Sequence, residues 1–126
     1  MKCLFINTKL LRPKAPQNVT GVINSDGSIT VDFEQVDGAK AYIVHYGGAN
    51  QSDPHDAIFM GYTETLTWNL GVGDVPALEV GDKIYLYVQS YREVGEGSSD
   101  IEKAAYLNSG PFTGSSWSDP AILEKK

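Results

Sequence analysis

The sequence predicts an all-β fold, a two-sheet antiparallel sandwich of about seven strands. Residues 29–46 hold two runs in which apolar and polar side chains alternate, and a turn at 36–39 joins the runs. A period of two is typical of a strand that is buried on one face. The 13 glycines and 6 prolines are spread along the chain, which suits many short strands joined by turns.

Seven strands are expected, each short except one. They lie at residues 19–22, 28–34, 41–46, 59–63, 66–70, 83–92 and 117–123. The pair Asp26-Gly27 predicts a hairpin turn, because both residues tolerate positive φ. The strand at 59–63 and the last strand, which Pro120 interrupts, are expected at sheet edges. The side chains expected in the core are Ile29, Val31, Phe33, Tyr42, Val44, Tyr46, Leu66, Trp68, Leu70, Ile84, Leu86 and Val88.

A short helix is predicted at residues 100–107, inside the long connection before the last strand. Ser99 is its expected N-cap, and Glu102 completes a capping box. Gly110 and Pro111 end it. The segment 99–112 is one functional candidate, because loops often carry function. The predicted helix has an apolar stripe formed by Ile101, Ala104, Ala105 and Leu107. The alternative role is structural, in which Ile101, Leu107 and Phe112 would close one open end of the sandwich.

Two parts of the chain are distinguished: residues 1–15 as an N-terminal extension or linker, and residues 16–126 as the domain. The apolar pieces 4–6 and 10–11 favour docking of the extension onto the domain, since an exposed apolar patch is costly. Polar residues 7–9 interrupt the first apolar run, which disfavours a signal peptide. No segment approaches the ~20 apolar residues that span a bilayer, so no membrane partner is expected.

The charge and cysteine content exclude several classes. The net charge is −6 and the pI is about 4.7. A protein that binds duplex nucleic acid needs a basic surface, so no nucleic-acid partner is expected. The single cysteine, Cys3, rules out an intrachain disulfide and a cysteine-rich zinc site.

Several motifs resemble one family. The pattern Ile29-x-Val31-x-Phe33, followed by the turn 36–39 and the alternating run to Tyr46, resembles the second and third strands of a bacterial fibronectin type III domain. That resemblance implies an immunoglobulin-like sandwich. Phe33 stands where the family usually has Trp. The corner tyrosine of the family falls on Ile84 if Leu78 is aligned, or on Tyr85 with a one-residue slip that would swap the faces of the strand. The apolar run favours Ile84 facing inward, so a tyrosine corner is expected to be missing. Other matching positions are Leu78, Gly81, Leu86, Val88 and 116–120.

A narrower set of pieces is most similar to the C-terminal domain appended to bacteriophage major tail proteins. These pieces are residues 46–50, 61–65, 100–107 and 112–115. The resemblance implies a structural and adhesion module on the surface of the virion tail, with the parent tail-tube protein as one partner. A bacterial cell-surface glycan or wall polymer, bound weakly, would be the other. The alternative is an extracellular spacer or carbohydrate-binding module of a secreted bacterial enzyme.

No enzyme, cofactor or metal site is expected. The residues His45, Asp53, His55 and Asp56 match no zinc-ligand spacing. The sequence holds no Ser-His-Asp order and no nucleophile elbow. Acidic residues fall on turns and on the outer faces of strands, without a paired arrangement for acid–base work.

The leading functional candidate is the outer face of the strands at 41–46 and 83–92. It would present an exposed platform of Tyr85, Tyr87, Tyr91, Ile43 and His45. Tyrosine combines an apolar ring with a polar tip, which suits binding and stacking on sugar rings. The structural alternatives are cross-strand packing that stabilises the sheet, or cover by the apolar residues 4–6.

Overall fold

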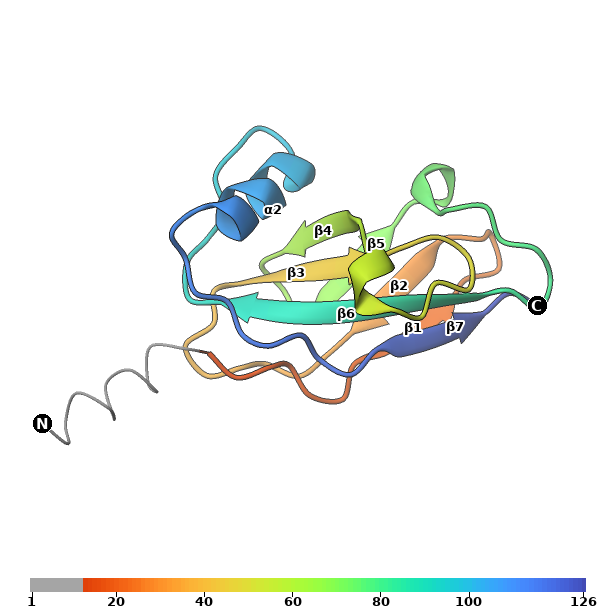
Figure 1. Cartoon of the computed structure of the whole chain (residues 1–126), viewed down its shortest axis with the longest axis horizontal. Coiled ribbons are helices and arrows are strands. Elements are labelled where there is room, and N and C mark those ends of the chain that lie inside the picture. Colours follow the sequence, from red (N-terminus) through yellow and green to blue (C-terminus); the bar gives the residue numbers. More distant parts are fainter. Residues whose placement is uncertain (1–12) are drawn as a thin grey trace, which may run out of the picture.

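The chain folds as a sandwich of two antiparallel sheets (Figure 1), in a computed structural model that describes residues 13–126. The expected docking of residues 4–6 and 10–11 lies outside the described residues. One sheet has the order β1-β2-β5, formed by Thr20–Ile23, Ile29–Asp32 and Thr67–Leu70. The other has the order β4-β3-β6-β7, formed by Phe59–Thr63, Ala41–Tyr46, Lys83–Tyr91 and Ala121–Glu124. The predicted fold class is therefore confirmed, and β4 and β7 are edge strands as expected.

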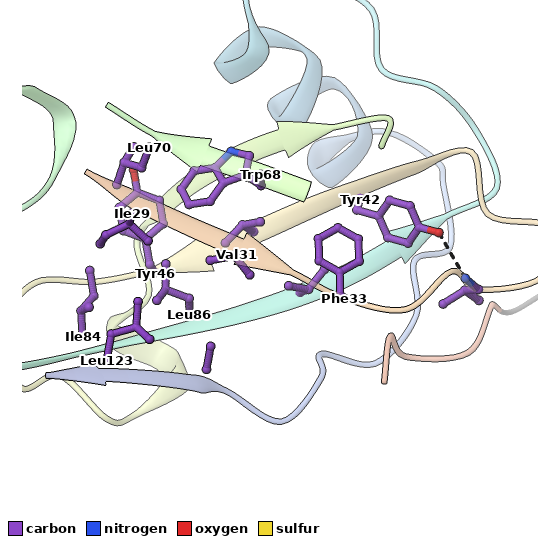
Figure 2. Close-up of a cluster of buried hydrophobic side chains, with 14 residues drawn as sticks. Ile29, Val31, Phe33, Tyr42, Tyr46, Trp68, Leu70, Ile84, Leu86 and Leu123 are labelled. Atoms are coloured by element: carbon purple, nitrogen blue, oxygen red, sulfur yellow. Dashed lines mark hydrogen bonds between the residues drawn. The ribbon is translucent and has the colours of Figure 1, made fainter. Parts of the chain in front are cut away.

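The core between the sheets is built by the side chains that alternation placed inward (Figure 2). Ile29, Val31 and Ile84 are fully buried there. The ring of Tyr42 packs on Phe33, with centroids 4.7 Å apart, and its hydroxyl accepts a 3.2 Å hydrogen bond from the Val36 N–H. This bond lets the core contain a tyrosine without an unpaired hydroxyl.

Leu66 is the exception to the predicted core. It is 39% exposed, because β5 begins only at Thr67 and Leu66 belongs to the preceding turn. Ile84 faces the core, and the next residue, Tyr85, points to the opposite face of β6. Neither position therefore places a tyrosine ring in the core, where a tyrosine corner would need it.

The predicted helix is α2, Asp100–Ser109. The Oγ of Ser99 accepts a 3.2 Å hydrogen bond from the Glu102 N–H, as expected for the N-cap. The Glu102 carboxylate, however, accepts from the backbone N–H and hydroxyl of Ser98, so the reciprocal half of the capping box is shifted by one residue. No helix within residues 13–126 is long and apolar enough to cross a membrane.

The place of α2 differs from the expectation. Figure 1 shows it beside the four-stranded sheet, and not between the two sheets at an open end. Ala104 and Leu107 are fully buried against the outer face of that sheet, whereas Ile101 is 68% exposed. The helix thus covers one sheet from outside, and Ile101 takes no part in the packing. Two 3₁₀ turns, η1 (Pro54–Asp56) and η2 (Val72–Asp74), complete the elements.

The two sheets approach closely where Trp68 of β5 meets β4. The Trp68 indole lies against the backbone of Gly61, and a Cβ added at Gly61 would stand less than 3.0 Å from the ring. Trp68 is also in contact with the Tyr46 ring, at a centroid distance of 5.6 Å. Only glycine fits at position 61 without displacing a core tryptophan.

We therefore expect Gly61→Ala to lower the free energy of unfolding by about 1–3 kcal/mol, the usual cost of forcing extra atoms into a packed core. Urea denaturation followed by tryptophan fluorescence measures the change. Gly71→Ala is the matched control, because nothing lies within 4 Å of its added Cβ and its φ is −62°. Equal stability of the two variants would contradict this account of the β4–β5 contact.

Candidate functional site

The five residues of the predicted platform do share the outer face of β3 and β6. The register places His45 opposite Tyr87 and Ile43 opposite Gln89, with Tyr91 at the end of the same face. The face is not open to solvent, however. Ile43 is fully buried, and the exposed fractions of His45, Tyr91 and Tyr87 are 2%, 3% and 6%. The expected exposure is wrong for these four residues, and Tyr85 alone among the five is half-buried.

Helix α2 covers the first part of this face. Its Ala104 and Leu107 pack with Ala41, Ile43, Tyr62 and Tyr91 into a second hydrophobic cluster, with Met60 and Phe112 at the margin. Burial of these apolar side chains stabilises the helix, because a helix of this length is only marginally stable by itself in water. Residues 100–112 therefore cover the first part of the outer face.

Tyr62 of β4 is hydrogen-bonded to the segment that leads into α2. Its hydroxyl accepts a 2.8 Å hydrogen bond from the Gly95 N–H and donates a 2.6 Å bond to Glu64. Burial, followed by the bond to Glu64, raises the pKa of Tyr62 to about 12. The ammonium group of Lys103 lies 5.7 Å from the Tyr62 ring centroid, so one tyrosine contacts both the approach to the helix and the helix itself.

Trp117 covers the second part of the face. Its ring stacks on the His45 imidazole, with centroids 4.0 Å apart and planes inclined by 14°. It also contacts the Tyr87 ring at 5.5 Å. Trp117 remains half-buried, so the indole separates His45 and Tyr87 from solvent while keeping part of its own surface exposed.

Two serines direct Trp117 onto the sheet. The backbone N–H of Ser115 and of Ser118 donates to the carbonyl of Ser90 and of Val88, and their hydroxyls accept from the N–H groups of the same two residues. The four residues 115–118 thus lie opposite the three residues 88–90 of β6, which leaves one extra residue as in a β-bulge. The sequence pattern predicts that the last strand begins at Trp117, but β7 begins only at Ala121 and Trp117 instead covers His45 and Tyr87, a role that the pattern does not indicate.

A buried amide links the two parts of the face. The Oε1 of Gln89 accepts from His45 Nε2 at 2.9 Å and from the Tyr91 hydroxyl at 3.3 Å, and its Nε2 donates to the Ser115 carbonyl at 3.0 Å. The acceptor role of Gln89 assigns the proton of a neutral imidazole to Nε2. Burial lowers the pKa of His45, and the bond to Gln89 opposes that shift only in part.

The polar loop that follows β3 borders this face. The Tyr87 hydroxyl donates a 2.8 Å bond to the Ser52 carbonyl, and Asn50 is bonded to Asp82 and to the Lys83 N–H. Burial, then the charges of Tyr85 and Asp53, raise the pKa of Tyr87. The loop is therefore held beside the tyrosines of β6.

The histidines do not form a metal site. His45 is buried under Trp117, while the His55 side chain is exposed and its Nδ1 lies 3.0 Å from Asp53. Among residues 13–126, no group of three or more His, Cys, Asp or Glu side chains is placed to hold a metal ion. The clefts in this part of the chain include one between the edges of β1 and β7 and a polar one beside residues 15–19 and 117–119.

Comparison with known proteins rests on structure. No protein-family model matches the chain, and no curated protein sequence is significantly similar to it. A solved structure of a Fn3-like protein from Clostridium thermocellum matches with a TM-score of 0.53 and 16% identity, covering 90% of this chain and 94% of that one. The fold is Fn3-like. At this identity the likeness concerns the fold alone.

The buried imidazole gives the Fn3-like domain a pH-dependent stability. The unfolded chain takes up a proton at His45 as the pH falls through about 6.5, whereas the native domain resists protonation because its pKa is lowered. We expect the free energy of unfolding to fall between pH 7.5 and 5.5, by at most about 1.4 kcal/mol per pH unit, and to level off below the native pKa.

Urea titrations at several pH values measure this slope, and His45→Phe is the matched variant because it retains a ring under Trp117. The slope should decrease in the variant. An unchanged slope would show that His45 is not its origin.

Proposed function

We propose that this Fn3-like domain is a non-catalytic structural and adhesion module, displayed on the surface of a phage tail tube, where it aids weak attachment to bacterial cell-surface polymers. One observation carries the adhesive part: aromatic side chains gather on the outer sheet face and reach the surface at Trp117 and Tyr85, beside a polar loop. Rings with polar groups at their border are common in binding surfaces.

The tail location is supported by the resemblance of residues 46–50, 61–65, 100–107 and 112–115 to the domain appended to phage major tail proteins. Two of these pieces lie next to each other in the fold, because α2 (residues 100–109) packs on β4, which contains residues 61–63. A domain attached to a tail tube needs a stable fold of its own, and the two hydrophobic clusters supply one.

A spacer or carbohydrate-binding module of a secreted bacterial enzyme is the second candidate. It is favoured by the path of the described chain, which enters at one end of the long axis and leaves at the other (Figure 1). That arrangement suits a domain placed between two others. Neighbouring capsid and tail genes would favour the first candidate, and a glycosidase domain in the same chain would favour the second.

The proposed adhesion predicts retention on bacteria. The domain, coupled at high density to beads so that weak contacts act together, should bind whole cells and purified wall polymers in a saturable manner. Beads that carry an unrelated domain of similar size and negative charge are the control. Retention no greater than that control would overturn the adhesive function.

A further inference from the structure

Four side chains form a continuous row on the outer face of β6 and β7, here called the aromatic strip: Tyr85, Tyr87, Trp117 and Ile122. Tyr85 and Tyr87 are two residues apart on β6 and therefore point to the same side. The register pairs Tyr85 with Ile122 of β7, and the Trp117 ring contacts Tyr87 at 5.5 Å.

Two members of the aromatic strip, Tyr87 and Trp117, are fixed before any ligand arrives. Tyr87 is held by its bond to the Ser52 carbonyl, and Trp117 is held on His45. Tyr85 and Trp117 are half-buried and Ile122 is 54% exposed, so an apolar surface reaches solvent over a rigid base. Side chains that are already ordered lose little conformational entropy when a ligand binds.

Polar groups lie along one side of the aromatic strip. Gln51, Ser52 and Asp53 are exposed in the loop that Tyr87 anchors, and Asp53 is near enough for its charge to raise the pKa of Tyr87. Amides, hydroxyls and carboxylates next to an apolar surface supply the hydrogen-bond partners that orient a ligand rich in hydroxyl groups.

The charge of the surface decides between classes of polymer. The whole chain has a net charge of −6, and the exposed carboxylates of Asp53 and Glu124 border the aromatic strip, with Lys83 opposite Glu124 as a neighbouring cation. A polyphosphate polymer would meet like charge and a shortage of cations. An uncharged polymer meets neither obstacle.

We infer that the aromatic strip binds an uncharged polysaccharide, with sugar rings lying on Tyr85, Trp117 and Ile122 and hydroxyls bonded to the loop at 51–53. The inference rests on the proposed function and assigns its adhesive surface and ligand class. It also separates this surface from the face originally expected, because Ile43, His45 and Tyr91 lie under the cover and contact no ligand.

The test uses the full chain on beads with immobilised neutral polysaccharides (a β-glucan, a galactan and a rhamnan) and, in parallel, polyglycerol phosphate. Tyr85→Ala and Ile122→Ser change exposed parts of the strip and spare the cover over His45. Each should weaken binding to a neutral polysaccharide about three- to tenfold, the value of one ring or apolar contact. Tyr106→Ala, which removes a 38% exposed tyrosine from α2, should leave binding unchanged.

Melting curves of each variant confirm that the fold is retained. Stronger binding to polyglycerol phosphate than to every neutral polysaccharide would overturn the inference, as would an equal loss in Tyr106→Ala. If cells are bound but neither strip variant weakens binding, the inference fails and the adhesive function stands. If neutral polysaccharides are bound through the strip but cells are not, the adhesive function fails. No binding to any surface overturns both.

Discussion

Strand β3 is the element on which the rest of the structure depends, because both of its faces are buried along its whole length. Tyr42, Val44 and Tyr46 face the core between the sheets, whereas Ala41, Ile43 and His45 face α2 and Trp117. A two-sheet sandwich normally leaves the outer face of each sheet to water. Here the connection between β6 and β7 folds back and supplies a third layer, and the second hydrophobic cluster compensates for ordering that long segment.

The period-two pattern is sufficient to predict the sandwich, the inward side chains except Leu66, and the bounds of β3 and β4, since alternation and turn chemistry are local properties. The cover was not predictable in the same way, because α2 and Trp117 lie more than fifty residues after β3 and their docking depends on tertiary packing. One feature of the sequence does indicate the cover. Ala41 and Ile43 are apolar on the face of β3 that was expected to be exposed to solvent, and a nearly continuous apolar run is typical of a strand buried on both faces.

Trp117 shows a second limit of local pattern. Its neighbours resemble a closing strand, yet the side chains of Ser115 and Ser118 take the place of backbone acceptors toward β6 and introduce an extra residue into the pairing. A shift of one residue moves a side chain to the other face of a sheet. The consequence is a tryptophan that lies over His45 and Tyr87, which turns an expected open tyrosine surface into a narrower strip with a rigid base.

The positions of the first and last strands also bear on mechanical load. β1 and β7 belong to different sheets, each at an edge, and the chain enters beside one end of the domain and leaves beside the other (Figure 1). A pulling force along the long axis would act parallel to the β1–β2 and β6–β7 ladders. It would load all hydrogen bonds of a ladder together in shear, and not one after another as in unzipping. Tension applied in this direction would therefore load the strands along their length.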